Sequence, residues 1–157
     1  MLRRSNGIIA LLICAMFTAH ELMGALYLMS AVQKEASWIV WAGVGMIGAH
    51  VVLSTLTTRQ MLHDEERPPN KRKKEHQLKK WVTGIVLVVM LAAHVLAPFD
   101  GAVWILASMI LAIAVCTHIC VSAKSLSFDV SAPRSSIAIV RAIAITPTFV
   151  VIAALLF

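Results

Sequence analysis

Charged residues are scarce in this sequence. Only 14% of its 157 residues are Asp, Glu, Lys or Arg, whereas a soluble globular domain carries about a quarter. Hydrophobic residues make up 59%, and the mean hydropathy is +0.83. This composition excludes an ordinary soluble domain, and the apolar segments leave no room for one. We therefore expect any chemistry on a water-soluble substrate to belong to a partner chain.

Cysteine is also scarce. The three cysteines, Cys14, Cys116 and Cys120, all lie inside apolar segments, and the sequence has no C-x-x-C-H motif. Covalently attached c-type haem is therefore excluded. Cys116 and Cys120 lie one helical turn apart, which is compatible with a soft metal site or with small packing residues. We expect packing.

Five apolar runs of about 20 residues dominate the chain. Each is close to the length that a helix needs to cross a hydrocarbon core of about 30 Å. The runs cover about 7–32, 37–60, 81–98, 102–123 and 135–157. The first is too long for the apolar part of a secretory signal, so we expect it to be a span. The sequence thus predicts an all-α integral membrane protein, a single domain over 1–157 with five transmembrane helices.

The short link Phe99-Asp100-Gly101 follows Pro98 and predicts an antiparallel hairpin of the third and fourth helices. With five spans, the Lys and Arg residues fall almost entirely on one side of the membrane, and Lys34 alone falls on the other. Because cytoplasmic loops carry the Lys/Arg excess, we expect a cytoplasmic N-terminus and an external C-terminus in the cell (inner) membrane.

The segment 59–80 is strongly basic but also holds four acidic residues, and it lies between two spans. Two interpretations stay open for it. It either sets the topology and contacts lipid headgroups, or it forms a docking face for a peripheral protein. We do not expect it to bind nucleic acid.

Four histidines lie within the first four runs, one in each: His20, His50, His94 and His118. An ionisable side chain inside a span is rare and indicates a functional site, because an unpartnered polar ring is costly in hydrocarbon. At a rise of 1.5 Å per residue, the alternating helix directions place His20 and His94 towards the outer face, and His50 and His118 towards the inner face. The sequence predicts two tiers separated in depth by about 10 Å.

Helices one and three, and helices two and four, are the diagonals of a four-helix up-down bundle. Cofactor sites are built in the cores of such bundles, and two imidazoles at one depth can hold one iron from both faces. We therefore predict two stacked b-type haems, an outer one on His20 and His94 and an inner one on His50 and His118. The fifth helix, which lacks histidine, packs outside the bundle. A metal transporter using His, Met and Cys is an alternative, although two separate histidine pairs leave tetrahedral coordination incomplete.

Small residues precede one of these histidines. Gly43, Gly45, Gly48 and Ala49 lie directly before His50. Small side chains in a membrane allow two helices to approach closely, and they also leave room for a flat macrocycle. Both interpretations stay open.

Two stretches carry a resemblance to a known family. One is Lys80-Trp-Val-Thr-Gly-Ile-Val-Leu with His94 ten residues after Gly84, and the other is Thr117-His-Ile-Cys-Val-Ser-Ala-Lys-Ser-Leu-Ser-Phe-Asp129. Together with the arrangement of spans, they resemble the di-haem, five-helix cytochrome b subunits of succinate dehydrogenase and quinol:fumarate reductase (complex II). The family often has its helix without ligands third of five, whereas here it is the fifth.

The resemblance implies a membrane anchor that is not catalytic by itself. It would pass electrons between a quinone, menaquinone or ubiquinone, and a cytoplasmic pair of flavoprotein and iron–sulfur subunits. Near the inner interface, Arg59, Lys79 and Lys124 are candidates to pair with haem propionates, or else cations that extend to the headgroups. Another transmembrane di-haem cytochrome, of the ascorbate-reducing or formate-dehydrogenase type, is the alternative within electron transfer.

Glu21 is the only acidic residue deep inside a run. It follows His20 directly, so its side chain points about 100° away from the ligand on a helix. It is our candidate for the proton acceptor of a quinone site. A carboxylate hydrogen-bonded to a neighbouring helix is the structural alternative.

Overall fold

The chain folds into five long α-helices. The computed structural model describes residues 2–31, 37–64, 68–97 and 101–156. The helices are α1 (Leu2–Leu28), α2 (Ser37–Leu62), α3 (Lys71–Leu96), α4 (Ala102–Asp129) and α5 (Ser136–Leu156). Each is long and apolar enough to cross a membrane, which confirms the predicted helical architecture. Lys34 and the link residues Phe99 and Asp100 lie outside the described ranges.

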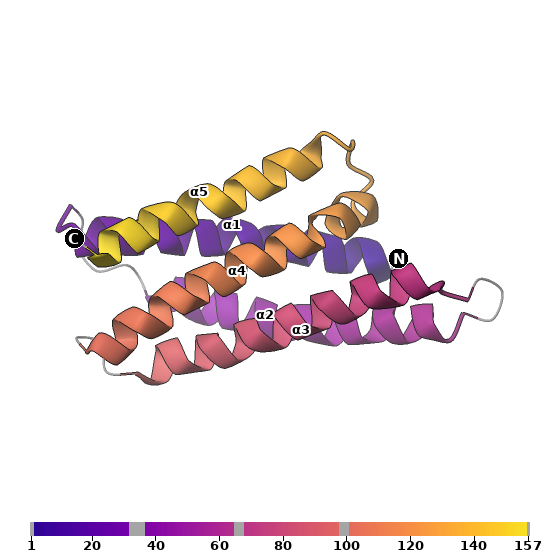
Figure 1. Ribbon diagram of the computed structural model, residues 1–157, viewed down its shortest axis with the longest axis horizontal. Coiled ribbons are helices and arrows are strands. Elements are labelled where there is room, and N and C mark those ends of the chain that lie inside the picture. The colour runs from indigo at the N-terminus through magenta and orange to yellow at the C-terminus, as the bar shows by residue number, and fades with distance from the viewer. Residues whose placement is uncertain (1, 32–36, 65–67, 98–100, 157) are drawn as a thin grey trace.

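Successive helices run in opposite directions (Figure 1). The start of α1, the end of α2, the start of α3 and the end of α4 lie together, and we call this the basic end. It carries most of the Lys and Arg residues, including Arg3, Arg59 and Lys124. The end of α5 lies at the opposite end of the molecule.

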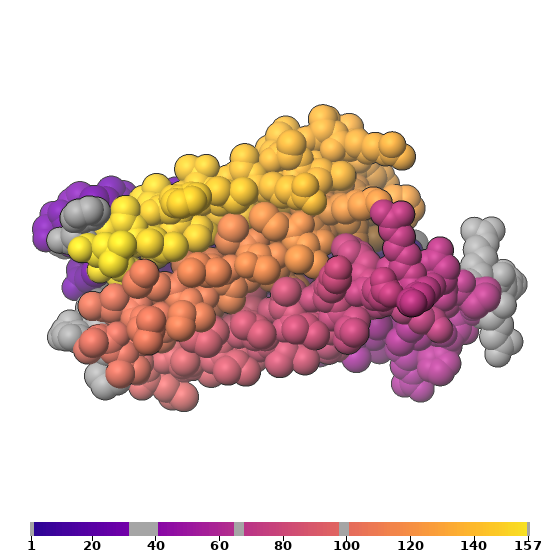
Figure 2. Space-filling view, in the orientation of Figure 1, coloured from indigo at the N-terminus to yellow at the C-terminus, as the bar shows by residue number. Residues whose placement is uncertain are grey.

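α4 is the centre of the packing. It packs against α3 and α5 and less extensively against α1, while α1 also packs against α2 and α5. Figure 2 shows α3, α4 and α5 side by side on one face. Most of the buried apolar side chains belong to α4, namely Ala107, Leu111, Ala112, Ala114, Val115, Ala123 and Leu126. The alanines let the neighbouring backbones approach, and α5 lies against α1 and α4, on the outside of the α1–α4 group.

The outer surface of the helices is apolar. Trp41 is 72% exposed, Leu96 82%, Phe128 76% and Phe149 70%. α3 has no buried residue although its second half is strongly apolar. A soluble protein rarely exposes so much contiguous apolar surface, whereas lipid chains solvate it. The fold therefore matches a membrane environment.

α3 begins at Lys71, ten residues before the start expected from hydropathy. Asn70 caps it, because its side-chain oxygen accepts a hydrogen bond from the Lys73 amide at 2.9 Å. The residues that follow are Lys, Arg, Glu and Gln, which are good helix formers. Much of the charged segment 59–80 is therefore helical, and α3, with 26 residues, extends beyond the apolar run 81–98 at its N-terminal end. α5, with 21 residues, is the shortest helix.

Polar contacts hold helices together near the basic end. Asn6 on α1 exchanges hydrogen bonds of 3.3 and 3.4 Å with Ser54 on α2. Thr58 on α2 accepts from the side chains of Gln77 at 2.7 Å and Trp81 at 3.3 Å, both on α3. α1 also approaches α4 closely, since a Cβ atom on Gly7 would lie only 2.8 Å from Val130 Cγ1. These contacts fix the register of the first four helices.

Candidate cofactor site

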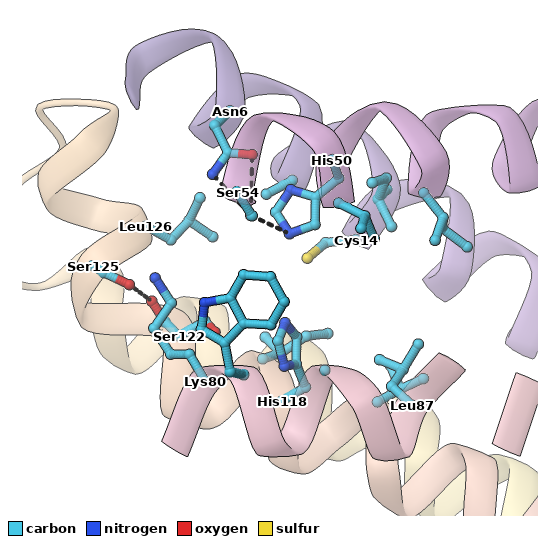
Figure 3. Close-up of a pocket in the computed structure, with 18 of the residues that line it drawn as sticks. Asn6, Cys14, His50, Ser54, Lys80, Leu87, His118, Ser122, Ser125 and Leu126 are labelled. Atoms are coloured by element: carbon cyan, nitrogen blue, oxygen red, sulfur yellow. Dashed lines mark hydrogen bonds between the residues drawn. The ribbon is translucent and has the colours of Figure 1, made fainter. Parts of the chain in front are cut away.

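A cavity of about 210 Å³ lies between α1, α2, α3 and α4. All four helices contribute to its lining, and the lining is mostly apolar, with a polar group towards the basic end. His50 from α2 and His118 from α4 lie on opposite walls (Figure 3). The cavity therefore brings together the two histidines that the depth argument assigned to the inner tier.

His118 is held by α3. Its Nδ1 atom lies 2.9 Å from Thr83 Oγ1. A Cβ atom on the next residue, Gly84, would lie 3.4 Å from His118 Cε1 and 3.7 Å from Nδ1. Because Gly84 has no side chain, the imidazole occupies the space beside the α3 backbone.

His50 is held less completely. Its Nε2 atom lies 3.5 Å from Ser54 Oγ, at the limit of a hydrogen bond. Its Nδ1 atom is buried and has no hydrogen-bond partner in the part of the chain that the structure describes. A buried polar atom without a partner requires an explanation, and a ligand in the adjoining cavity supplies one.

The other two histidines form a second pair. His94 Nδ1 lies 2.8 Å from Ser108 Oγ on α4, and the His94 ring packs on Trp104 with 5.4 Å between ring centroids. His20 lies close enough to His94 for an electrostatic interaction, as His50 does to His118. The structure thus associates the same histidines as the depth argument, although His20 and His94 do not line the cavity.

The two tiers are further apart than expected. On α3, Thr83 lies at the inner tier and His94 at the outer tier. On α4, His118 lies at the inner tier and Ser108 at the outer tier. At 1.5 Å per residue, the separation comes to about 16.5 Å along α3 and about 15 Å along α4, instead of about 10 Å. The expected value was counted from assumed span ends, but α3 and α4 extend beyond those ends, and their packing sets the register.

Lys80 is the cation that lines the cavity among the residues that the structure describes. It is half-buried and interacts electrostatically with Asp129 and Arg3. The residues that the sequence offered as propionate contacts, Arg59, Lys79 and Lys124, are exposed, and none of them lines the cavity. Lys79 and Lys80 are neighbours at the predicted start of a span, so hydropathy treats them alike. Only the rotation of α3 about its axis decides that Lys80, and not Lys79, lines the cavity.

Polar atoms accompany Lys80 at the basic end of the cavity. Gln77, Ser125 and Asp129 contribute to the lining. Ser122 does as well, and its hydroxyl is buried without a hydrogen-bond partner among the described residues. Figure 3 shows Lys80 and Ser122 on the same side of the cavity as Ser125. This end can bind an anionic group, whereas the remainder suits an apolar one.

The remaining candidates lie elsewhere. Glu21 is half-buried on α1 and does not line the cavity. Cys116 and Cys120 lie one turn apart on α4 and do not line the cavity. Within residues 2–31, 37–64, 68–97 and 101–156, no cluster of three or more His, Cys, Asp or Glu side chains could hold a metal ion. Cys14 lines the cavity, whereas Gly45 and Gly48 face open space.

Comparison of the chain with protein-family models, curated proteins and solved structures finds no match. Function is therefore inferred from the chain's own residues. Thr83 and Ser108 were not singled out as functional residues from the sequence. Thr83 does belong to the Lys80-Trp-Val-Thr-Gly stretch, but nothing in the sequence distinguishes Ser108 from other hydroxyl residues in the spans.

Proposed function

We propose that this protein is the membrane anchor and electron-transfer subunit of an oxidoreductase, and that it binds two b-type haems. His50 and His118 hold the inner haem, and His20 and His94 hold the outer haem. The observation that carries the proposal is the position of His50 and His118 on opposite walls of one cavity between four helices. A haem iron with two imidazole ligands supplies one-electron redox chemistry.

The lining of the cavity suits an amphipathic macrocycle. Apolar side chains such as Phe17, Ile47 and Ile85 cover most of it, and Lys80 lies at its polar end. An ammonium group pairs well with the carboxylates of a haem. The buried, unpartnered hydroxyl of Ser122 adds a donor there.

Room for the macrocycle depends on the contact between α2 and α3. The volume of about 210 Å³ is below the roughly 300 Å³ at which small-molecule pockets begin, so the helices have to separate on binding. Among the described residues, α2 and α3 do not pack extensively, and their hydrogen bonds converge on Thr58 near the basic end. Separation of these two helices therefore disrupts little packing.

We place the protein in the cell (inner) membrane. The excess of Lys and Arg at the basic end supports an orientation with this end in the cytoplasm. The first turns of α3 expose Lys71, Arg72, Lys73 and Lys74, and such a surface can attract an acidic face of a partner. The partners that we propose are a flavoprotein and an iron–sulfur protein of the succinate dehydrogenase or fumarate reductase type. The inner tier is nearer to this docking end, and the outer tier extends the path across the membrane.

At the outer tier we propose a quinone site. Glu21 is a half-buried carboxyl group next to His20, and quinone chemistry requires a proton acceptor beside an electron acceptor. The Glu21 carboxylate would accept a proton from a quinol, and in the opposite direction the protonated carboxyl group would donate it to a quinone.

The test is optical. The full chain, purified in detergent, is expected to give a reduced-minus-oxidised spectrum with a b-type band and two haems per chain. A protein that folds but shows no haem band after expression with ample haem would refute the proposal.

A further inference from the structure

Two histidine–hydroxyl contacts join α3 and α4 in a reciprocal way. At the inner tier, His118 of α4 meets the hydroxyl of Thr83 on α3, with 2.9 Å between Nδ1 and Oγ1. At the outer tier, His94 of α3 meets the hydroxyl of Ser108 on α4, with 2.8 Å between Nδ1 and Oγ. Each helix therefore provides one histidine and one hydroxyl group, and the same ring nitrogen is engaged both times.

The direction of these hydrogen bonds follows from the backbone. Thr83 Oγ1 also lies 3.0 Å from the Lys79 carbonyl oxygen and 3.1 Å from that of Lys80. Ser108 Oγ lies 2.7 Å from the Trp104 carbonyl oxygen. A carbonyl oxygen only accepts, so each hydroxyl hydrogen is directed to the backbone of its own helix. The hydroxyl oxygen then accepts, and the histidine Nδ1–H donates.

From this geometry we infer that Thr83 and Ser108 are positioning residues that hold His118 and His94 as the Nδ1–H tautomer. The lone pair on Nε2 then remains available as an iron ligand. Metal-binding histidines characteristically donate their second ring N–H to an acceptor, which fixes the ring and makes it a stronger ligand. The role in haem binding rests on the proposed function, whereas the assignment of the tautomer does not.

Each hydroxyl group therefore influences one haem only. Thr83→Val keeps the shape of the side chain but removes the acceptor for His118. Loss of such a partner weakens metal binding by about 10-fold or more, and a weaker donor destabilises the oxidised iron. If the tenfold loss falls entirely on the oxidised form, the reduction potential of the inner haem rises by about 59 mV. Ser108→Ala has the same effect on the outer haem.

Matched variants separate positioning from packing. Thr83→Ser and Ser108→Thr keep the acceptor, so we expect the wild-type potentials. Thr117→Val is the control, because Thr117 is next to His118 in sequence but its hydroxyl donates to the Ile113 carbonyl oxygen of its own helix at 2.8 Å. Its removal leaves both potentials unchanged.

The experiment has two readouts. NMR of nitrogen-labelled histidine in the haem-free full chain, in lipid nanodiscs, is expected to show Nδ1–H for His94 and His118, and loss of this tautomer preference at His118 in Thr83→Val. Redox titration of the haem-loaded chain is expected to show a shift of one potential in each variant. An Nε2–H tautomer in the wild type, or a Thr83→Val protein with an unchanged tautomer and potential, would overturn the inference. A wild-type chain without haem would defeat the proposed function, but the NMR result would still decide the tautomer.

Discussion

Replacement of Gly84 tests the inner site by steric means. A Cβ atom at this position lies 3.4 Å from His118 Cε1, which is ordinary contact, and 3.7 Å from Nδ1. Gly84→Ala is therefore tolerated, and we expect inner-haem affinity within about 10-fold of wild type. Gly84→Leu adds three further carbon atoms directed at the imidazole and the cavity. Overpacking of this kind costs about 1–3 kcal/mol, which corresponds to roughly a 5- to 150-fold loss of affinity for the inner haem.

The assay for Gly84 is haem content measured by optical spectroscopy after titration of the haem-free chain. Gly45→Leu is the matched control, because a Cβ atom on Gly45 has no neighbour within 4 Å. The control should retain both haems, and Gly84→Leu should lose the inner haem while it keeps the outer one. Equal haem content in Gly84→Leu and Gly45→Leu would show that His118 and its cavity do not form the site.

Three further changes are informative. Lys80→Gln should weaken inner-haem binding by about fivefold, since a half-exposed charge contributes about 1 kcal/mol, and Lys79→Gln should not; the opposite order in a haem titration would return the propionate contact to Lys79. Glu21→Gln should lower quinol turnover by at least about 10-fold with both haems retained, and unchanged turnover would make Glu21 structural. Gly7→Ala should lower the unfolding temperature in detergent, because its Cβ atom would lie 2.8 Å from Val130, at a cost of about 1–3 kcal/mol. A Cβ atom on Gly24 would have no neighbour within 4 Å, so Gly24→Ala should raise the unfolding temperature through better helix propensity. A higher unfolding temperature for Gly7→Ala than for Gly24→Ala would contradict the close approach of α1 and α4.

Much of the fold could be predicted from hydropathy. Lengths of apolar sequence gave the number of helices, and the lack of histidine in the fifth run anticipated that α5 lies outside the first four helices. The helix boundaries were harder to predict, because hydropathy does not detect a helical turn built from charged residues. α3 starts at Lys71 for reasons of capping and propensity, which the apolar pattern does not contain.

The histidines of the candidate site could be predicted from the sequence, but their surroundings could not. Position along each run was sufficient to associate His50 with His118 and His20 with His94. Position along each run was not sufficient to predict the distance between the tiers, because that distance depends on the register between helices. The contacts of Thr83, Ser108 and Lys80 depend on the rotation of α3 and α4 about their own axes, which is set by packing on the alanine-rich face of α4.

The central claim is that each haem is shared by one pair of histidines, and haem stoichiometry in single histidine variants tests it most directly. Each variant of the full chain, His20→Ala, His50→Ala, His94→Ala and His118→Ala, is purified and its reduced-minus-oxidised spectrum and haem-to-protein ratio are measured. We predict one remaining haem in every variant, with one spectrum common to the His50 and His118 variants and a different one common to the His20 and His94 variants. Different haems lost within one pair, or a full complement of haem in any of the four, would contradict the account.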